Sequence, residues 1–138
     1  MIEQLTVNVW IGRGVTREEI ARPSWDQVEA AIRALNERER NDIYLTPSAC
    51  DLETYLSVGG GDGRYLVTGS INNERFPTVA TGPRLGSARE ATEELVSGGQ
   101  MGDYPCRWIL DLATALRAIR SFYDTSEFGG SDVIWEGM

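Results

Sequence analysis

The sequence contains no histidine and no lysine, and its two cysteines, Cys50 and Cys106, are far apart. Histidine is the usual base of Ser and Cys nucleophiles and a common zinc ligand, so its absence excludes Ser-His-Asp and Cys-His catalysis. The cysteines show no CxxC spacing, and we expect two buried, reduced thiols. These absences predict a protein without a metal or cofactor.

Long apolar runs are also absent. No segment approaches the roughly 20 apolar residues of a membrane span, and Met1–Gln4 lacks the basic and apolar regions of a signal peptide. We therefore expect a cytoplasmic protein without a membrane partner. A chain of 138 residues suits one domain, 1–138, which buries about two-thirds of its unfolded surface.

Basic residues are few compared with acidic ones. The chain has 13 basic residues, all arginine, against 21 acidic ones, which gives a net charge of -8. An acidic surface disfavours nucleic acid as a direct ligand and favours a basic partner. Solubility alone would also account for the acidity.

The strongest local pattern is a β-hairpin. Thr54–Val58 and Arg64–Thr68 are rich in aromatic and β-branched residues, and Gly59–Gly63 separates them. The glycine segment lacks the Lys and Ser/Thr of a P-loop and precedes a strand, so we expect a five-residue turn at the centre of a sheet. Alternation in the first arm groups Leu52 with Leu56 and Val58 on a buried face, which leaves room for helices on one side only.

The remaining elements follow from periodicity and capping signals. Ser24 and Gln27 form a capping-box pattern before an amphipathic helix over 25–35, and Asp111 is a good N-cap for a second helix over 112–123. Strands are expected at 5–10, 43–45, 75–80, with Pro77 at an edge or bulge, and 133–135, and a helical turn at 16–20.

Residues 88–97 suit either a helix or a strand. The predicted fold class is α+β, an antiparallel β-sheet with two main helices packed on one face.

Two pairs of adjacent carboxylates, Glu18/Glu19 and Glu93/Glu94, are candidates for acid–base chemistry. Neighbouring residues point in different directions, whereas glycosidase-type chemistry needs carboxyls that face each other across about 5 to 9.5 Å. Solvated surface charge is the simpler interpretation, and a small carboxylate-dependent enzyme is the alternative.

The C-terminal part resembles a known family. Gly98-Gly99-Gln100, Tyr104-Pro105, Arg107-Trp108, the following helix and the closing Val133-Ile134-Trp135 are similar to the "immunity protein one" family of bacterial polymorphic-toxin systems. The order of the earlier elements also fits. The resemblance implies structural roles for a set of residues: Trp25, Gly59, Gly60, Gly98, Gly99, Gln100, Pro105, Trp108, Phe122 and Trp135.

The resemblance implies a non-enzymatic function. Members of this family sit beside toxins, often of the deaminase superfamily, and neutralise them by binding. A single immunity-protein-like domain over 1–138 would then bind a basic cognate toxin domain, as a monomer or a 1:1 complex, and occlude its active site; a general adaptor is a further alternative. As toxin-binding residues we expect an acidic rim around an aromatic anchor: Asp62, Glu90, Glu93, Glu94, Asp103 and Tyr104.

Overall fold

A computed structural model describes residues 2–81, 91–129 and 133–137. Within these residues the chain forms nine strands and two α-helices, which confirms the predicted α+β class. The strands are β1 (Gln4–Ile11), β2 (Gly14–Ala21), β3 (Asp42–Thr46), β4 (Tyr55–Gly61), β5 (Arg64–Ser70), β6 (Thr78–Ala80), β7 (Thr92–Ser97), β8 (Gln100–Pro105) and β9 (Ile134–Glu136). The helices are α1 (Trp25–Arg33), α2 (Leu112–Thr125) and the short 3-10 helix η1 (Cys106–Trp108).

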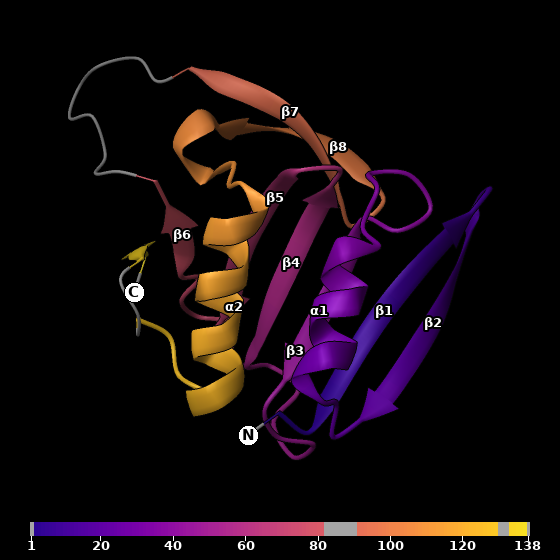
Figure 1. The fold of residues 1–138 in the computed structure, drawn as a ribbon, viewed down its shortest axis with the longest axis vertical. Coiled ribbons are helices and arrows are strands. Elements are labelled where there is room, and N and C mark those ends of the chain that lie inside the picture. The colour runs from indigo at the N-terminus through magenta and orange to yellow at the C-terminus, as the bar shows by residue number, and fades with distance from the viewer. Residues whose placement is uncertain (1, 82–90, 130–132, 138) are drawn as a thin grey trace.

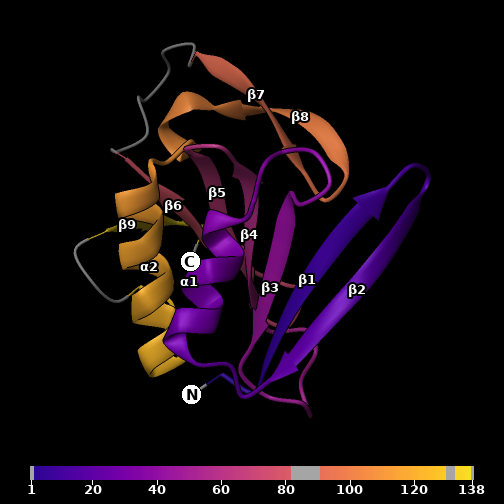
Figure 2. The ribbon, with the colours of Figure 1, turned by 45° about the vertical axis from the view of Figure 1, so that its right-hand side comes forward.

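Seven strands form one antiparallel sheet in the order β2-β1-β3-β4-β5-β6-β9 (Figure 1). The hairpin strand β4 lies at its centre, as predicted. Among the described residues, strands β7 and β8 pair only with each other, and they cross one end of the large sheet as a separate arm (Figure 2). Figures 1 and 2 both draw α1 and α2 on the same side of the large sheet.

The hydrophobic core fills the space between this side of the sheet and the helices. Residues that pair across antiparallel strands share a face, so the registers align Leu5, Leu45 and Leu56 in one row. A parallel row, Val7, Ile43, Val58 and Val67, runs beside it. Both rows are buried in one cluster with Val28 and Ile32 of α1 and with residues of α2.

Capping fixes where the helices begin. Ser24 and Gln27 form the predicted capping box at α1, and Asp111 caps α2 by accepting a hydrogen bond from the Thr114 N–H at 2.8 Å. The N-terminal end of α1 is joined to the C-terminal end of α2, because the Tyr123 hydroxyl donates to the Pro23 carbonyl at 2.8 Å. Both predicted helices are therefore confirmed. None of the described helices is long and apolar enough to cross a lipid bilayer.

The expected five-residue loop is wrong, because three of its glycines belong to β4. Gly59, Gly60 and Gly61 pair with β5, and only Asp62 and Gly63, both with positive φ, form the turn. A β-carbon on Gly61 would lie 2.3 Å from the Asn36 nitrogen. The glycines therefore allow close packing against neighbouring segments, and an Asp-Gly pair supplies the two-residue turn.

The expected helical turn at residues 16–20 is also wrong. These residues lie in β2, which pairs with β1 along its whole length. Because the hairpin register with β1 fixes all eight residues, pairing prevails over their weak local preference. Leu52, expected on the buried face, is 71% exposed because β4 begins only at Tyr55.

Three further expectations need correction or resolution. Both cysteines are free, but they are exposed rather than buried, since each lies just outside the sheet, in a loop or in η1. Pro77 precedes β6, and β6 itself lies between β5 and β9 rather than at an edge. Of the ambiguous segment, Thr92–Ser97 is a strand, and residues 88–90 lie outside the described residues.

Candidate interaction surfaces

The side of the large sheet away from the core is lined by polar side chains. The registers align Glu19, Thr6, Tyr44, Ser57, Thr68, Thr78 and Glu136 in one row across all seven strands. Hydroxyl groups dominate this row, and Thr68 and Thr78 share a hydrogen bond at 3.0 Å. We call this surface the polar face.

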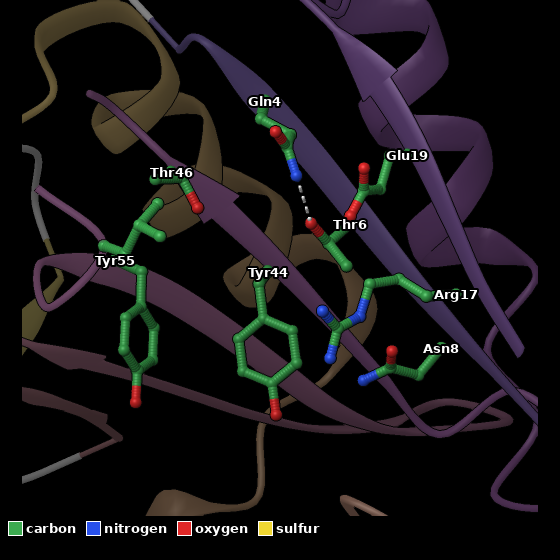
Figure 3. Close-up of a pocket in the computed structure, with 9 residues that line it drawn as sticks. Gln4, Thr6, Asn8, Arg17, Glu19, Tyr44, Thr46 and Tyr55 are labelled. Atoms are coloured by element: carbon green, nitrogen blue, oxygen red, sulfur yellow. Dashed lines mark hydrogen bonds between the residues drawn. The ribbon is translucent and has the colours of Figure 1, made fainter. Parts of the chain in front are cut away.

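A hollow of about 550 Å³ lies on the polar face near the start of β1 (Figure 3). Tyr44 and Tyr55 form its aromatic side, with ring centroids 5.5 Å apart in an edge arrangement. Arg17 and Glu19 of β2 line its other side, and among the described residues neither has an ion-pair partner. The remaining lining residues are Gln4, Thr6, Asn8, Thr46 and Leu52.

A buried carboxylate organises the neighbouring part of the polar face. Asp42 is 1% exposed and accepts hydrogen bonds from the Asn8 amide at 2.7 Å and the Trp10 indole at 2.8 Å. Burial raises the pKa of the Tyr44 phenol above its usual value, and the negative charge of Asp42 raises it further. Tyr44 therefore stays protonated and able to donate a hydrogen bond.

A second hollow of about 410 Å³ lies at the β9 end of the polar face. Arg107 forms a bidentate ion pair with Glu136, at 2.8 Å for the closest contact, and the Trp108 indole donates to the same carboxylate at 2.9 Å. The hydrogen bonds that the Arg107 guanidinium donates to Glu136 raise the pKa of Arg107. This cluster ties η1 to the last strand of the sheet.

The β7–β8 arm is fixed to the body by Arg64, at the start of β5. Its guanidinium binds Glu37 at 2.8 Å and Glu93 of the arm at 2.7 Å, and the hydrogen bonds that it donates to both carboxylates raise its pKa. Glu37 also accepts the backbone N–H of Val96, and Asn41 accepts that of Gly99. The arm is therefore held at both ends of its length.

The structure brings some of the predicted toxin-binding residues together and separates others. Glu94 and Asp103 are exposed and pair directly across the arm. Glu93 is paired with Tyr104 and turned toward Arg64, and Tyr104 is half-buried. Asp62 is exposed at the β4–β5 turn, and Glu90 lies outside the described residues.

Several residues that the resemblance marks as structural lie at packing contacts. Trp25 packs edge-on against Tyr123, and Phe122 is fully buried in the core. A β-carbon on Gly59 would lie 2.0 Å from the Ser97 hydroxyl oxygen, and one on Gly60 would lie 2.3 Å from a backbone oxygen.

The other residues that the resemblance marks as structural lie in the arm, in η1 and in the last strand. Gly98 and Gly99 form the arm's turn with positive φ, and Gln100 and Pro105 bound β8. Trp108 binds Glu136, and Trp135 packs against Phe128 at 5.5 Å.

Sequence reasoning missed the hollow and the contacts of Arg64. Tyr44 and Tyr55 belong to different strands and become neighbours only through the β3–β4 register. The alternation of Thr6, Asn8 and Trp10 along β1 was the available signal for a polar face. It could not show which residues of other strands would join that face.

The adjacent carboxylates do not form facing pairs. Neighbouring strand residues point to opposite faces, and accordingly Glu18 pairs with Arg40 at 3.3 Å while Glu19 lines the hollow. Glu93 pairs with Arg64 and Glu94 is exposed. Within the part of the chain that the structure describes, no group of three or more His, Cys, Asp or Glu residues is placed to hold a metal ion.

Fold and surfaces together define an α+β domain with an open polar sheet face and an acidic arm. A family model described as Immunity protein Imm1 matches residues 16–136, and the chain belongs to this family. The family resemblance found in the sequence is thereby confirmed. Comparisons with curated proteins and with solved structures return no match.

Proposed function

We propose that this chain is an immunity protein that binds a cognate toxin domain inside the producing cell and neutralises it by occluding the toxin's active site. The observation that carries the proposal is the match to the Imm1 family over residues 16–136. Residues 1–138 act as one immunity domain, and binding rather than catalysis is its activity.

The toxin is a basic domain that acts on nucleic acid, with a deaminase as the leading candidate from the family resemblance. The net charge of -8 supports this assignment, because an enzyme that holds phosphate groups presents a positive surface. Charge complementarity of this kind accelerates association and disfavours wrong partners.

The toxin contacts the outer side of the β7–β8 arm. Glu94 and Asp103 lie directly opposite each other there, and like charges in this position are unfavourable in the free protein. A basic side chain placed between them would relieve the repulsion. Met101 is 65% exposed two pairs further along the arm, on the same face, and offers apolar contact area beside the two carboxylates.

Co-expression tests the proposal. The toxin domain encoded beside this gene should stop growth when expressed alone, and cells that also express this chain should grow, with the two proteins co-purifying. Death at the same rate with and without the chain, and no co-purification, would refute the immunity function. A neighbouring gene that encodes no secreted toxin would favour a general adaptor instead.

A further inference from the structure

Strand β2 forms an exposed edge of the large sheet. It is eight residues long, and seven of these residues are exposed. The opposite edge strand, β9, has only three residues. Long edge strands present unpaired backbone groups and are templates for pairing with another strand.

Two of the usual devices that blunt an edge, proline and a β-bulge, are absent from β2. It contains no proline, and its register with β1 runs without a bulge from Gln4 opposite Ala21 to Ile11 opposite Gly14. Charged side chains are its only protection, and these lie in the segment Arg17–Glu19. The charges that these side chains would meet on a second strand therefore decide whether the edge repels or attracts that strand.

The backbone groups available for pairing belong to alternate residues. Ile11 and Gly14 flank a two-residue turn and form its hydrogen-bonded pair, so the next hydrogen-bonded pairs fall at every second position. Val15, Arg17 and Glu19 accordingly direct their N–H and C=O groups away from β1. The Trp10 N–H agrees with this assignment, because it donates to Glu39 on the far side of β1, away from β2.

Two of these outward residues carry opposite charges. Arg17 and Glu19 are two positions apart, so both side chains lie on the polar face. No ion pair with a described residue holds either of them. Glu18 points to the other side, where Arg40 neutralises it at 3.3 Å.

We propose that β2 pairs antiparallel with β2 of a second copy of this chain, about a two-fold axis at Glu18. In this register Arg17 lies opposite Glu19 of the second copy, and Glu19 lies opposite its Arg17. The two Glu18 side chains meet at the axis on the other side of the sheet, where each is ion-paired with Arg40 of its own chain. Both pairs fall at positions whose backbone groups point outward, so the hydrogen-bonded ladder and the ion pairs agree. The exposed Arg17 side chain, which extends over β1 in Figure 3, turns outward to make the contact.

The resulting dimer is weak. Two chains of charge -8 repel each other, and an edge-strand contact buries less than the roughly 1,600 Å² of a standard interface. We expect a dissociation constant on the order of tens of micromolar. Measurements belong at about 0.15 M salt, where the Debye length of about 8 Å limits the general repulsion.

The experiment is light scattering and sedimentation of the full chain over a concentration series. The wild type should move from monomer to dimer mass. Arg17→Glu and Glu19→Arg should each lose the dimer, because each places like charges opposite one another. Arg13→Glu is the matched control, since it reverses a charge in the β1–β2 turn outside the paired segment and should leave the dimer intact.

Mixing the two single variants makes the test specific. Arg17→Glu has two acidic side chains at the contact and Glu19→Arg has two basic ones, so an equimolar mixture should form a heterodimer although neither variant dimerises alone. The double variant Arg17→Glu/Glu19→Arg should dimerise by itself. A wild type that stays monomeric up to about 1 mM, or a mixture that stays monomeric, would overturn the proposal. Monomeric wild type with toxin binding weakened by the same variants would assign this edge to the toxin instead.

Discussion

Two polar groups of the sheet are buried with opposite outcomes. In β3, Asp42 accepts hydrogen bonds from the Asn8 amide and the Trp10 indole, so both donors have an acceptor. In β9, the indole nitrogen of Trp135 is buried and has no hydrogen-bond partner among the described residues. An unpaired buried donor costs about 1 to 3 kcal/mol, so Trp135 contributes to stability through its ring alone.

Replacement of Trp135 tests that statement. Trp135→Ala removes the ring that packs against Phe128 and should lower the free energy of unfolding by about 3 kcal/mol, the lower end for a buried Trp because this one is half-buried. Trp135→Phe keeps an aromatic ring and removes the unpaired donor, so it should cost about 1 kcal/mol or less. Urea unfolding measures both, and equal losses would contradict the role of the ring.

Tyr44 gives a pH-dependent prediction. Its pKa is raised in the folded protein, chiefly by burial, so the folded state holds the phenolic proton above pH ~10, where the unfolded chain releases it. The unfolded state then binds fewer protons, and stability falls as the pH rises above that value; below it the group contributes no pH dependence. Urea unfolding between pH 8 and about 11 should show a shallower loss in Tyr44→Phe than in the wild type. Stability profiles of the two proteins that run parallel over this pH range would refute the prediction.

Among the elements, the β7–β8 arm depends most on contacts outside itself. It pairs with no strand of the large sheet, and Arg64, Glu37 and Asn41 hold it. Gly59 lets it approach β4, because a β-carbon there would lie 2.6 Å from the Ser97 β-carbon. A methyl group at position 59 must therefore displace the arm.

The predicted consequence is local. Gly59→Ala should weaken docking of the arm by about 1 to 3 kcal/mol, seen as faster hydrogen exchange of amides in residues 92–105, with exchange in α1 and α2 unchanged. Ser97→Gly removes the colliding atoms, so the double variant should recover most of the protection. Ser97→Gly alone is the control for added backbone freedom. Equal exchange in the single and double variants would show that this contact does not seat the arm.

Elements with local signals were predictable from the sequence. Ser24 and Asp111 cap their helices through bonds three residues away, and such patterns are visible in a single segment. The β2 strand was not predictable, because its exposed residues owe their conformation to β1. At the site, Glu94 and Asp103 meet through the β7–β8 register, which the two-residue Gly98-Gly99 turn fixes. This pairing could not be predicted while residues 88–97 suited a helix as well as a strand.

Over the whole molecule, the surplus of negative charge acts before any contact forms. A net charge of -8 attracts a basic partner over about a Debye length, so it affects the association rate and depends on salt. Interface aromatics and apolar contacts act mainly on dissociation. The two contributions are therefore separable by kinetics.

Reversing charges on the arm makes this separation with the cognate toxin. Glu94→Arg and Asp103→Arg should each slow association several-fold at low salt, to about tenfold in the double variant, and the rates should converge with the wild type at high salt. Glu127→Arg changes the net charge by the same amount beyond α2, away from the arm, so it separates the local effect from the general one. Surface plasmon resonance or stopped-flow measurements at two salt concentrations give the association rates. If Glu94→Arg and Asp103→Arg match Glu127→Arg at both salts, the arm is not where the toxin first makes contact.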